Sequence, residues 1–206
     1  MLEHVPHWLG SLLHNVRAGH SKLVIVQEGV VTNDARLDLS SLAFADGGRL
    51  PPRFTADGEG VSPPLSWSGV PDGTAALALI VEDPDAPTPN PLVHAVVWNI
   101  APDTNGLPEG AIAADGPGSF DGSDVGRNSY RQEGWLPPDP PTGHGSHDYV
   151  FQLFALREAA PLDINPGRSE VLAAIRGAVL AAGMLVGTYS RGEEAPVGPA
   201  GAAQTA

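Results

Sequence analysis

Two apolar runs joined by an acidic, proline-rich corner dominate the hydrophobic pattern of the chain. The first run, Leu77–Val81, is continuous and stops at Glu82, after which the chain reads DPDAP. The second run, His94–Ile100, is rich in β-forming residues and has no helix-capping signal. Short apolar runs bounded by turn residues are typical of buried strands. The pattern therefore predicts two strands joined by a stiff corner, whose prolines restrict the backbone that carries Asp83 and Asp85.

Four further segments are interpreted as strands. The strongest is Tyr149–Leu156, and shorter ones are expected within residues 37–44, 65–68 and 186–191. Between residues 102 and 141 the chain has few apolar residues and many Gly, Pro, Asp and Asn. This composition predicts a long irregular region, and such regions in compact domains are often functional.

Two helices are predicted. Apolar residues recur at helical spacing over residues 6–17, which indicates a short amphipathic helix that Gly19 ends. Its apolar stripe fits either packing on its own domain or an oligomer contact, and both interpretations stay open. Ser169 is the expected N-cap of a second helix that ends near Gly183. The apolar face of this helix comprises Val171, Ile175 and Val179.

The length of 206 residues suits one domain with a substantial core. We expect an amphipathic extension over residues 1–20, a single domain over residues 21–191, and a disordered, Pro/Gly-rich tail over residues 192–206. The first residues lack the long apolar core, basic start and small-residue cleavage site of a signal peptide, and no run is long enough to span a membrane. A cytoplasmic protein is therefore expected.

Composition narrows the class of protein. The 25 Gly and 21 Pro residues demand many turns and favour β structure over a helix bundle. A net charge of −13 repels phosphate backbones, which argues against nucleic-acid binding. The absence of Cys excludes disulfides, a thiolate nucleophile and Cys-based zinc sites. No cofactor is expected.

The candidate chemistry gathers at three places: the acids Asp83 and Asp85 after one strand, His94 at the start of the next, and the segment from Pro141 to Tyr149. Because alternate side chains of an extended segment share a face, His147 and Tyr149 are expected on one side of their strand. Imidazole and hydroxyl donors suit a phosphate or carboxylate, with the acids orienting the histidines.

Other interpretations of the same residues stay open. His94 could be a hydrogen-bonded core residue, and Asp83 and Asp85 could close an Asx turn. His94, His147 and Asp83 are also suitable ligand types for zinc or iron. An enzyme that uses the Asp and His residues as a general acid and base, either a hydrolase or a metal-dependent enzyme, is the alternative function. The chain has no G-x-S-x-G elbow and no His-x-x-x-His helix motif to support it.

Three motifs carry a resemblance to a known family. They are VEDPDAP, then HAVVWNI, and then PPTGHGSHDYVFQLFAL. Together with SPPLSWSGVPDGT before the first strand and GTYSR after the late helix, they resemble the bacterial branch of the phosphatidylethanolamine-binding protein family, also called the Raf kinase inhibitor family. The resemblance extends from about Leu42 to Arg191.

The resemblance implies a mainly β fold, with a large central antiparallel sheet, a smaller second sheet and peripheral helices. It also implies a small pocket for phosphate, acetate or phosphorylated head groups. The family's site maps onto Asp83, Asp85, His94, Pro141, His147 and Tyr149. Members are described as binding or inhibitory proteins that act on kinases or proteases, without a catalysed reaction, and bacterial relatives together with the N-terminal extension suggest a homodimer.

Three departures from the family pattern stand near this site. Asp148 replaces the usual Arg, so a supporting ion pair is expected to be lost. Asp139 replaces a Gly at the pocket rim, where it would oppose anions by about 1 kcal/mol. Val93 and Ala95 leave less stacking surface beside His94 than the aromatic neighbours that are common in the family.

Overall fold

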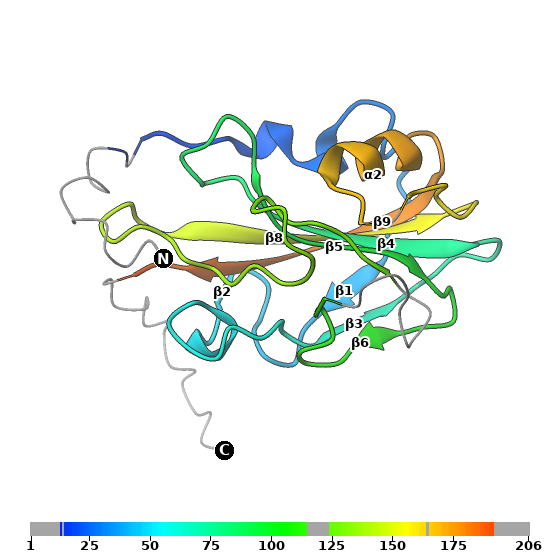
Figure 1. Ribbon diagram of the computed structural model, residues 1–206. Coiled ribbons are helices and arrows are strands. Elements are labelled where there is room, and N and C mark those ends of the chain that lie inside the picture. Colours follow the sequence, from blue (N-terminus) through cyan, green and yellow to red (C-terminus); the bar gives the residue numbers. More distant parts are fainter. Residues whose placement is uncertain (1–12, 14, 115–123, 164, 192–206) are drawn as a thin grey trace, which may run out of the picture.

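A computed structural model describes residues 13, 15–114, 124–163 and 165–191, and within these residues the chain forms two β-sheets (Figure 1). The larger sheet has six strands in the order β2-β9-β8-β4-β5-β7, and the smaller has the order β1-β3-β6. The strands are β1 Asp38–Ser40, β2 Gly48–Arg49, β3 Leu65–Ser68, β4 Ala76–Asp83, β5 Leu92–Ile100, β6 Gly106–Leu107, β7 Asp124–Val125, β8 His147–Leu156 and β9 Val179–Tyr189. The helical elements are α2 Arg168–Ile175 and the 3-10 turns η2 His20–Lys22, η3 Val24–Val26 and η4 Pro52–Phe54.

Strand pairing confirms the expected mainly β class with a large central sheet and a smaller second sheet. The pairs β4–β5, β4–β8 and β8–β9 are antiparallel, whereas the short edge strand β2 runs parallel to β9. Leu77 pairs with Ile100 and Asp83 with Leu92, so the acidic corner is the connection of an antiparallel pair. None of the described helices has the length and apolar character of a membrane span.

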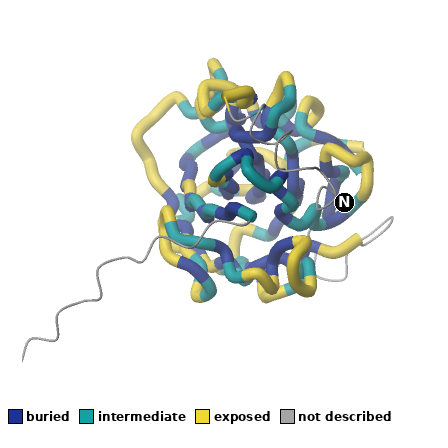
Figure 2. Tube along the Cα trace, turned by 90° about the vertical axis from the view of Figure 1, so that its left-hand side faces the viewer, coloured by how far each residue is buried: buried dark blue, intermediate teal, exposed yellow. Residues whose placement is uncertain are grey.

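The central strand β4 is buried on both of its faces. Residues such as Leu77 and Leu79 pack in the cluster between the two sheets, while Ala78 and Ile80 pack against α2 and the N-terminal segment on the opposite face. Figure 1 shows these layers above and below the large sheet, and Figure 2 shows the buried residues at its centre. A strand covered on both faces needs apolar side chains at every position, which explains the continuous run.

The late helix is shorter than the sequence pattern predicts. Its N-cap is Gly167 without a side-chain cap, so the expectation for Ser169 is wrong, and the helix ends at Ile175. Val179 opens β9, which pairs with β8 along its whole length. Gly183, expected to end the helix, lies inside this strand, where a Cβ would approach the Leu37 backbone oxygen to 2.5 Å. Small residues that look helix-compatible are thus required here by close packing between chain segments.

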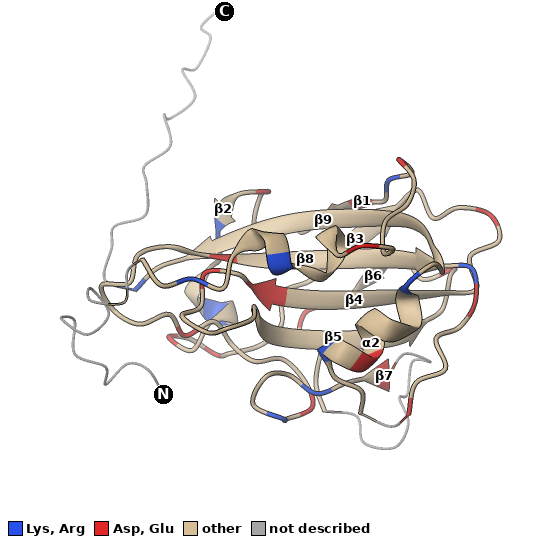
Figure 3. Cartoon of the chain, turned by 90° about the horizontal axis from the view of Figure 1, so that it is seen from above, with Lys and Arg blue, Asp and Glu red and all other residues tan. Residues whose placement is uncertain are grey.

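An N-terminal strap, defined as the described residues between 13 and 26, lies over the acidic corner. The amide groups of Ala18 and Gly19 donate to the carbonyl oxygens of Ala86 and Pro84. Further along the strap, the Val24 amide donates to buried Glu82, which also pairs with Arg168 on α2. Figure 3 shows acidic residues at one end of β4. Residues 6–12 and 14 of the helix expected over residues 6–17 lie outside the described residues, as does the tail over residues 192–206, whereas residues 15–17 are described and are not helical.

Candidate functional site

A cavity of about 450 Å³ lies where the ends of β4, β5 and β8 meet the loop around Leu136 to Pro141. Five of the six residues singled out from the sequence line it, namely Asp83, His94, Pro141, His147 and Tyr149. The rest of the wall is mostly apolar and includes Ala56, Ala86, Pro87, Leu92, Leu136, Pro137 and Pro140. Such a wall with a few convergent polar groups is typical of small-molecule sites.

Asp83 joins the turn to the cavity wall. Its Oδ1 accepts the amide protons of Asp85 and Ala86 at 2.8 and 2.9 Å, which closes an Asx-type turn. Its Oδ2 lies 2.7 Å from Nδ1 of His147. One carboxylate oxygen of Asp83 therefore closes the turn, and the other contacts His147 in the cavity wall.

Asp85 supports the site from behind and does not line the cavity. Its Oδ1 lies 2.5 Å from the guanidinium of Arg17, and its Oδ2 accepts the amide proton of Asp148 at 2.8 Å. The Asp148 side chain points instead to His20 on the strap, at 3.1 Å. Asp85 thus has a cationic partner, Arg17 on the strap, in place of the Arg that is usual at position 148. Sequence reasoning missed this partner because Arg17 is distant from Asp85 in the chain.

His94 is a buried neutral base in the cavity wall. Its Nδ1 donates to the Leu136 carbonyl oxygen at 2.6 Å, and burial lowers the pKa of its imidazole. Its Nε2 is therefore an acceptor, and it has no hydrogen-bond partner among the described residues. Aromatic contacts come from Trp135 and from the edge-on ring of Tyr149, at centroid distances of 6.1 and 5.0 Å. The reduced stacking expected from Val93 and Ala95 is compensated by residues remote in sequence.

Tyr149 supplies a neutral hydroxyl. Burial, followed by the negative charge of Asp83, raises its pKa well above the usual value. The hydroxyl is buried and has no hydrogen-bond partner within the described parts of the chain. It is thus a donor available to a ligand that reaches it.

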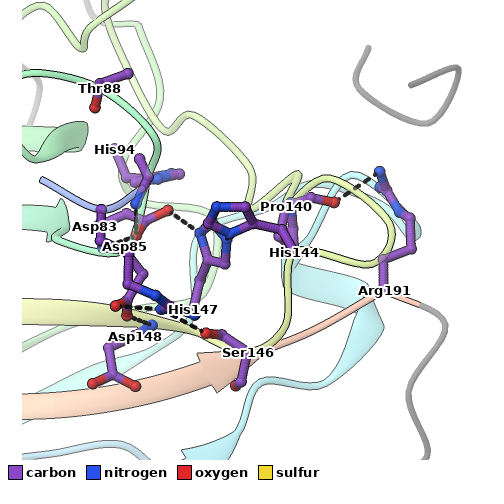
Figure 4. Close-up of polar contacts among 12 residues, drawn as sticks. Asp83, Asp85, Thr88, His94, Pro140, His144, Ser146, His147, Asp148 and Arg191 are labelled. Atoms are coloured by element: carbon purple, nitrogen blue, oxygen red, sulfur yellow. Dashed lines mark hydrogen bonds and ion pairs between the residues drawn. The ribbon is translucent and has the colours of Figure 1, made fainter. Parts of the chain in front are cut away.

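Arg191 compensates the charge of Asp139 at the rim. Its guanidinium lies 2.6 Å from Asp139 and 2.6 Å from Asp57, and the hydrogen bond from Arg191 lowers the pKa of Asp57. The repulsion of anions that the sequence predicts for Asp139 is therefore offset by a paired cation. Figure 4 shows Arg191 beside the Pro140 segment.

His144 is a further residue of this region that the sequence analysis missed. It is fully buried behind His147, with its Nδ1 2.7 Å from Nε2 of that residue. The flanking Gly143 and Gly145 have φ values of 84° and 95°, which L-residues with a side chain rarely adopt. The sequence Gly-His-Gly at residues 143–145 could have indicated His144, because two flanking glycines suggest a turn that fixes the position of the residue between them.

The family comparison decides the wider relationship. The model of a family described as "Phosphatidylethanolamine-binding protein" matches residues 40–190. The chain belongs to this phosphatidylethanolamine-binding protein family. The match begins after the N-terminal strap, so Arg17 and Leu13 lie outside the part of the chain that defines membership.

Relatives in this phosphatidylethanolamine-binding protein family span archaea and bacteria. A UPF0098 protein of Methanothermobacter thermautotrophicus is 46% identical over 158 residues, covering 76% of this chain and all of the relative. The crystal structure of Escherichia coli YbcL, described as a new member of the mammalian PEBP family, superposes with a TM-score of 0.70 and 31% identity, covering 76% of this chain and 99% of YbcL. A Mycobacterium tuberculosis protein named as lipoprotein LppC is 40% identical over 155 residues, covering 74% of this chain and 72% of that protein.

Metal-ligating types also approach one another beside the site. Among the described residues, ligand-type atoms of His20, Asp85 and Asp148 all lie within 4.8 Å of one another. Arg17 occupies one oxygen of Asp85, so a cation there would face a guanidinium. The sequence indicated His94, His147 and Asp83 as possible metal ligands. In the structure, Nδ1 of His147 contacts Asp83 and Nε2 of His147 contacts His144, so both ring nitrogens of His147 already have partners.

The two neutral histidines predict loss of stability in acid. Burial lowers the pKa of His94, and burial followed by the charge of His147 lowers that of His144. Below the unfolded value of about 6.5 the unfolded chain binds more protons, so stability falls as the pH decreases toward the folded values. We expect a decrease of up to about 1.4 kcal/mol per pH unit for each group, measured by urea unfolding between about pH 7.5 and 5. His144→Gln should reduce this slope, and an unchanged slope would contradict the assignment.

Proposed function

We propose that the protein binds a small molecule with an oxyanion head group, phosphate or carboxylate, in the cavity at the ends of β4, β5 and β8. The observation that carries the proposal is the composition of the cavity wall. It combines the Tyr149 hydroxyl, which lacks a partner among the described residues, with His147 and a mostly apolar surround. The name of the family is consistent with a phosphorylated head group as one such ligand.

The electrostatics of the wall support an anion despite the net charge of the chain. Asp83 and Asp139 are the acids that line the cavity, and each has a cationic or proton-donating partner, His147 and Arg191 respectively. A buried hydroxyl that donates to a ligand oxygen gains more from an ionised acceptor than from a neutral one. The apolar surround accommodates the carbon part of such a ligand.

We further propose that ligand occupancy modulates a protein partner, such as a kinase or a protease, and that the protein acts without catalysing a reaction. A homodimer and a cytoplasmic location belong to the same proposal. Light scattering of the full chain tests whether the protein is a homodimer. Cell fractionation tests the cytoplasmic location. One relative is named a lipoprotein, so membrane attachment is the competing outcome.

Thermal unfolding with phosphate, phosphoethanolamine and acetate, titrated separately, tests the binding proposal. At about ten times its dissociation constant a specific ligand stabilises the folded state by about 1.4 kcal/mol, which moves the midpoint by a few degrees. Tyr149→Phe removes only the buried hydroxyl, and we expect it to reduce the shift strongly. Tyr130→Phe makes the same chemical change at a half-exposed position of the same cavity and should leave the shift intact. No shift with any anion in the wild-type protein would refute the proposal.

A general-base enzyme is the second candidate, and one observation favours it. The Nε2 of His94 is a neutral, buried acceptor whose ring is oriented by the Leu136 carbonyl group, as a catalytic base requires. Hydrolysis of nitrophenyl esters and phosphates by purified protein tests this candidate. A rate that His94→Ala abolishes would favour it, whereas equal rates in the two proteins would assign the activity to a contaminant or to solvent.

A further inference from the structure

A line of hydrogen bonds runs from the cavity wall through two histidines to the N-terminal strap. Figure 4 shows Asp83, His147 and His144 of this line. Asp83 Oδ2 lies 2.7 Å from His147 Nδ1, and His147 Nε2 lies 2.7 Å from His144 Nδ1. His144 Nε2 in turn lies 2.8 Å from the carbonyl oxygen of Leu13 on the strap. These three hydrogen bonds need three protons, whereas two neutral imidazole rings supply only two.

The far end of this line determines where the His144 proton lies. Burial lowers the pKa of the His144 imidazole, so its ring carries one proton at neutral pH. A carbonyl oxygen only accepts hydrogen bonds, and therefore Nε2, which faces Leu13, holds that proton. The Nδ1 of His144 is left as an acceptor.

The acceptor on His144 determines the state of His147. Because His144 Nδ1 accepts, the Nε2 of His147 must donate and carries a proton. The Nδ1 of His147 faces Asp83 Oδ2, and the other oxygen of this carboxylate accepts the amide protons of Asp85 and Ala86, so the carboxylate is hydrogen-bonded as an acceptor at both oxygens. The remaining proton therefore belongs to His147 as well, which makes its ring an imidazolium.

We infer that His144 is a positioning residue that holds His147 doubly protonated, with the Leu13 carbonyl group selecting the tautomer of His144. The Asp83 carboxylate in the cavity wall is thus neutralised by His147, because of a histidine that does not line the cavity and a strap that lies outside the family match over residues 40–190. Both N–H groups of His147 are used internally. His147 consequently removes the repulsion that Asp83 would exert on an anion, while Tyr149 is the side chain that donates to it.

Substitutions at His144 separate this role from simple packing. His144→Leu fills the space without an acceptor, so we expect His147 to lose one proton, because a buried donor without a partner is costly. His144→Gln supplies both an acceptor and a donor, as the neutral imidazole does, and should keep His147 doubly protonated. A residue needed only for packing would not distinguish the two variants in this manner.

Nitrogen-detected NMR of the histidine rings in the ¹⁵N-labelled full chain reads the protonation states directly. In the wild-type protein at neutral pH we expect both nitrogens of His147 to be protonated and His144 to be the Nε2–H tautomer. A wild-type His147 with a single proton would overturn the inference, and so would a doubly protonated His147 in His144→Leu. If the Leu variant does not fold, the wild-type spectrum and that of His144→Gln still decide.

The consequence for binding rests on the proposed anion site and is tested with inorganic phosphate by calorimetry. Loss of the imidazolium next to Asp83 should weaken phosphate binding by about fivefold or more in His144→Leu, since an unscreened carboxylate then faces the ligand. The Gln variant should bind within about twofold of the wild type. Absence of phosphate binding in all three proteins would refute the proposed function while the NMR result still judges the role of His144.

Discussion

Glu82→Leu is expected to lower the free energy of unfolding by about 3–5 kcal/mol, since removing one member of a buried ion pair leaves its partners without compensation. The Glu82 carboxylate is fully buried and accepts from three elements. Its partners are the Arg168 guanidinium at 2.5 Å and, at 2.8 Å each, the Val24 amide and the Gln152 side chain. Leucine matches the volume and satisfies none of these donors, so the strap and α2 lose their shared anchor on β4.

Urea unfolding monitored by tryptophan fluorescence measures this effect. Glu28→Leu, on an exposed position of the chain, is the matched control and should change stability by less than about 0.5 kcal/mol. Hydrogen exchange should also accelerate at Val24 and Ile25, whose amide protons bond to Glu82 and Gln152. A loss of stability below about 1 kcal/mol would mean that the carboxylate contributes little beyond the desolvation it costs.

Asp83→Ala is expected to cost about 3–5 kcal/mol, because it strands the imidazolium of His147 together with two backbone amide groups. Asp83→Asn keeps an oxygen that can accept the amide protons of Asp85 and Ala86. It places an amide opposite His147, which is then expected to give up one proton. We therefore expect a smaller loss for this substitution, about 1–2 kcal/mol.

The comparison of the two substitutions separates the turn from the charge. Chemical denaturation of both variants provides the numbers, and Asp72→Ala in an exposed turn is the control for removal of a surface aspartate. Equal losses for Ala and Asn would show that the paired charge, rather than the side-chain oxygen that accepts the amide protons of Asp85 and Ala86, carries the stability. Histidine NMR of Asp83→Asn gives an independent readout, since a His147 that keeps both protons would contradict the expected change.

Local pattern was sufficient for the centre of the fold. The continuous run of Leu77–Val81 indicated a buried strand, and β4 is enclosed by two clusters of core residues. Period-two alternation placed His147 and Tyr149 on the same side of their strand, and both line the cavity. These features follow from the geometry of a single extended segment, so they are legible without knowledge of distant contacts.

The boundary between α2 and β9 could not be predicted from local sequence pattern in the same way. Ala181, Ala182 and Gly183 are compatible with a helix by composition, and a helix was expected to continue to Gly183. What favours a strand there is its pairing with β8 and the close approach of the Leu37 backbone, both of which are tertiary. Intrinsic preferences of a few tenths of a kcal/mol per residue yield to such packing.

The sequence by itself indicated which residue types the candidate site contains, because strand periodicity put His147 and Tyr149 on one side of their strand and the family motifs paired them with the DPDAP corner. The tertiary structure alone decided the protonation of these residues and the charges that lie beside them. Arg17, His144 and Arg191 supply the partners of Asp85, His147 and Asp139, and they lie between 3 and 68 residues away from them along the chain. Protonation and charge compensation depend on burial and on distances of a few ångströms, and such distances are set only when the strap, the sheet and the loops pack together.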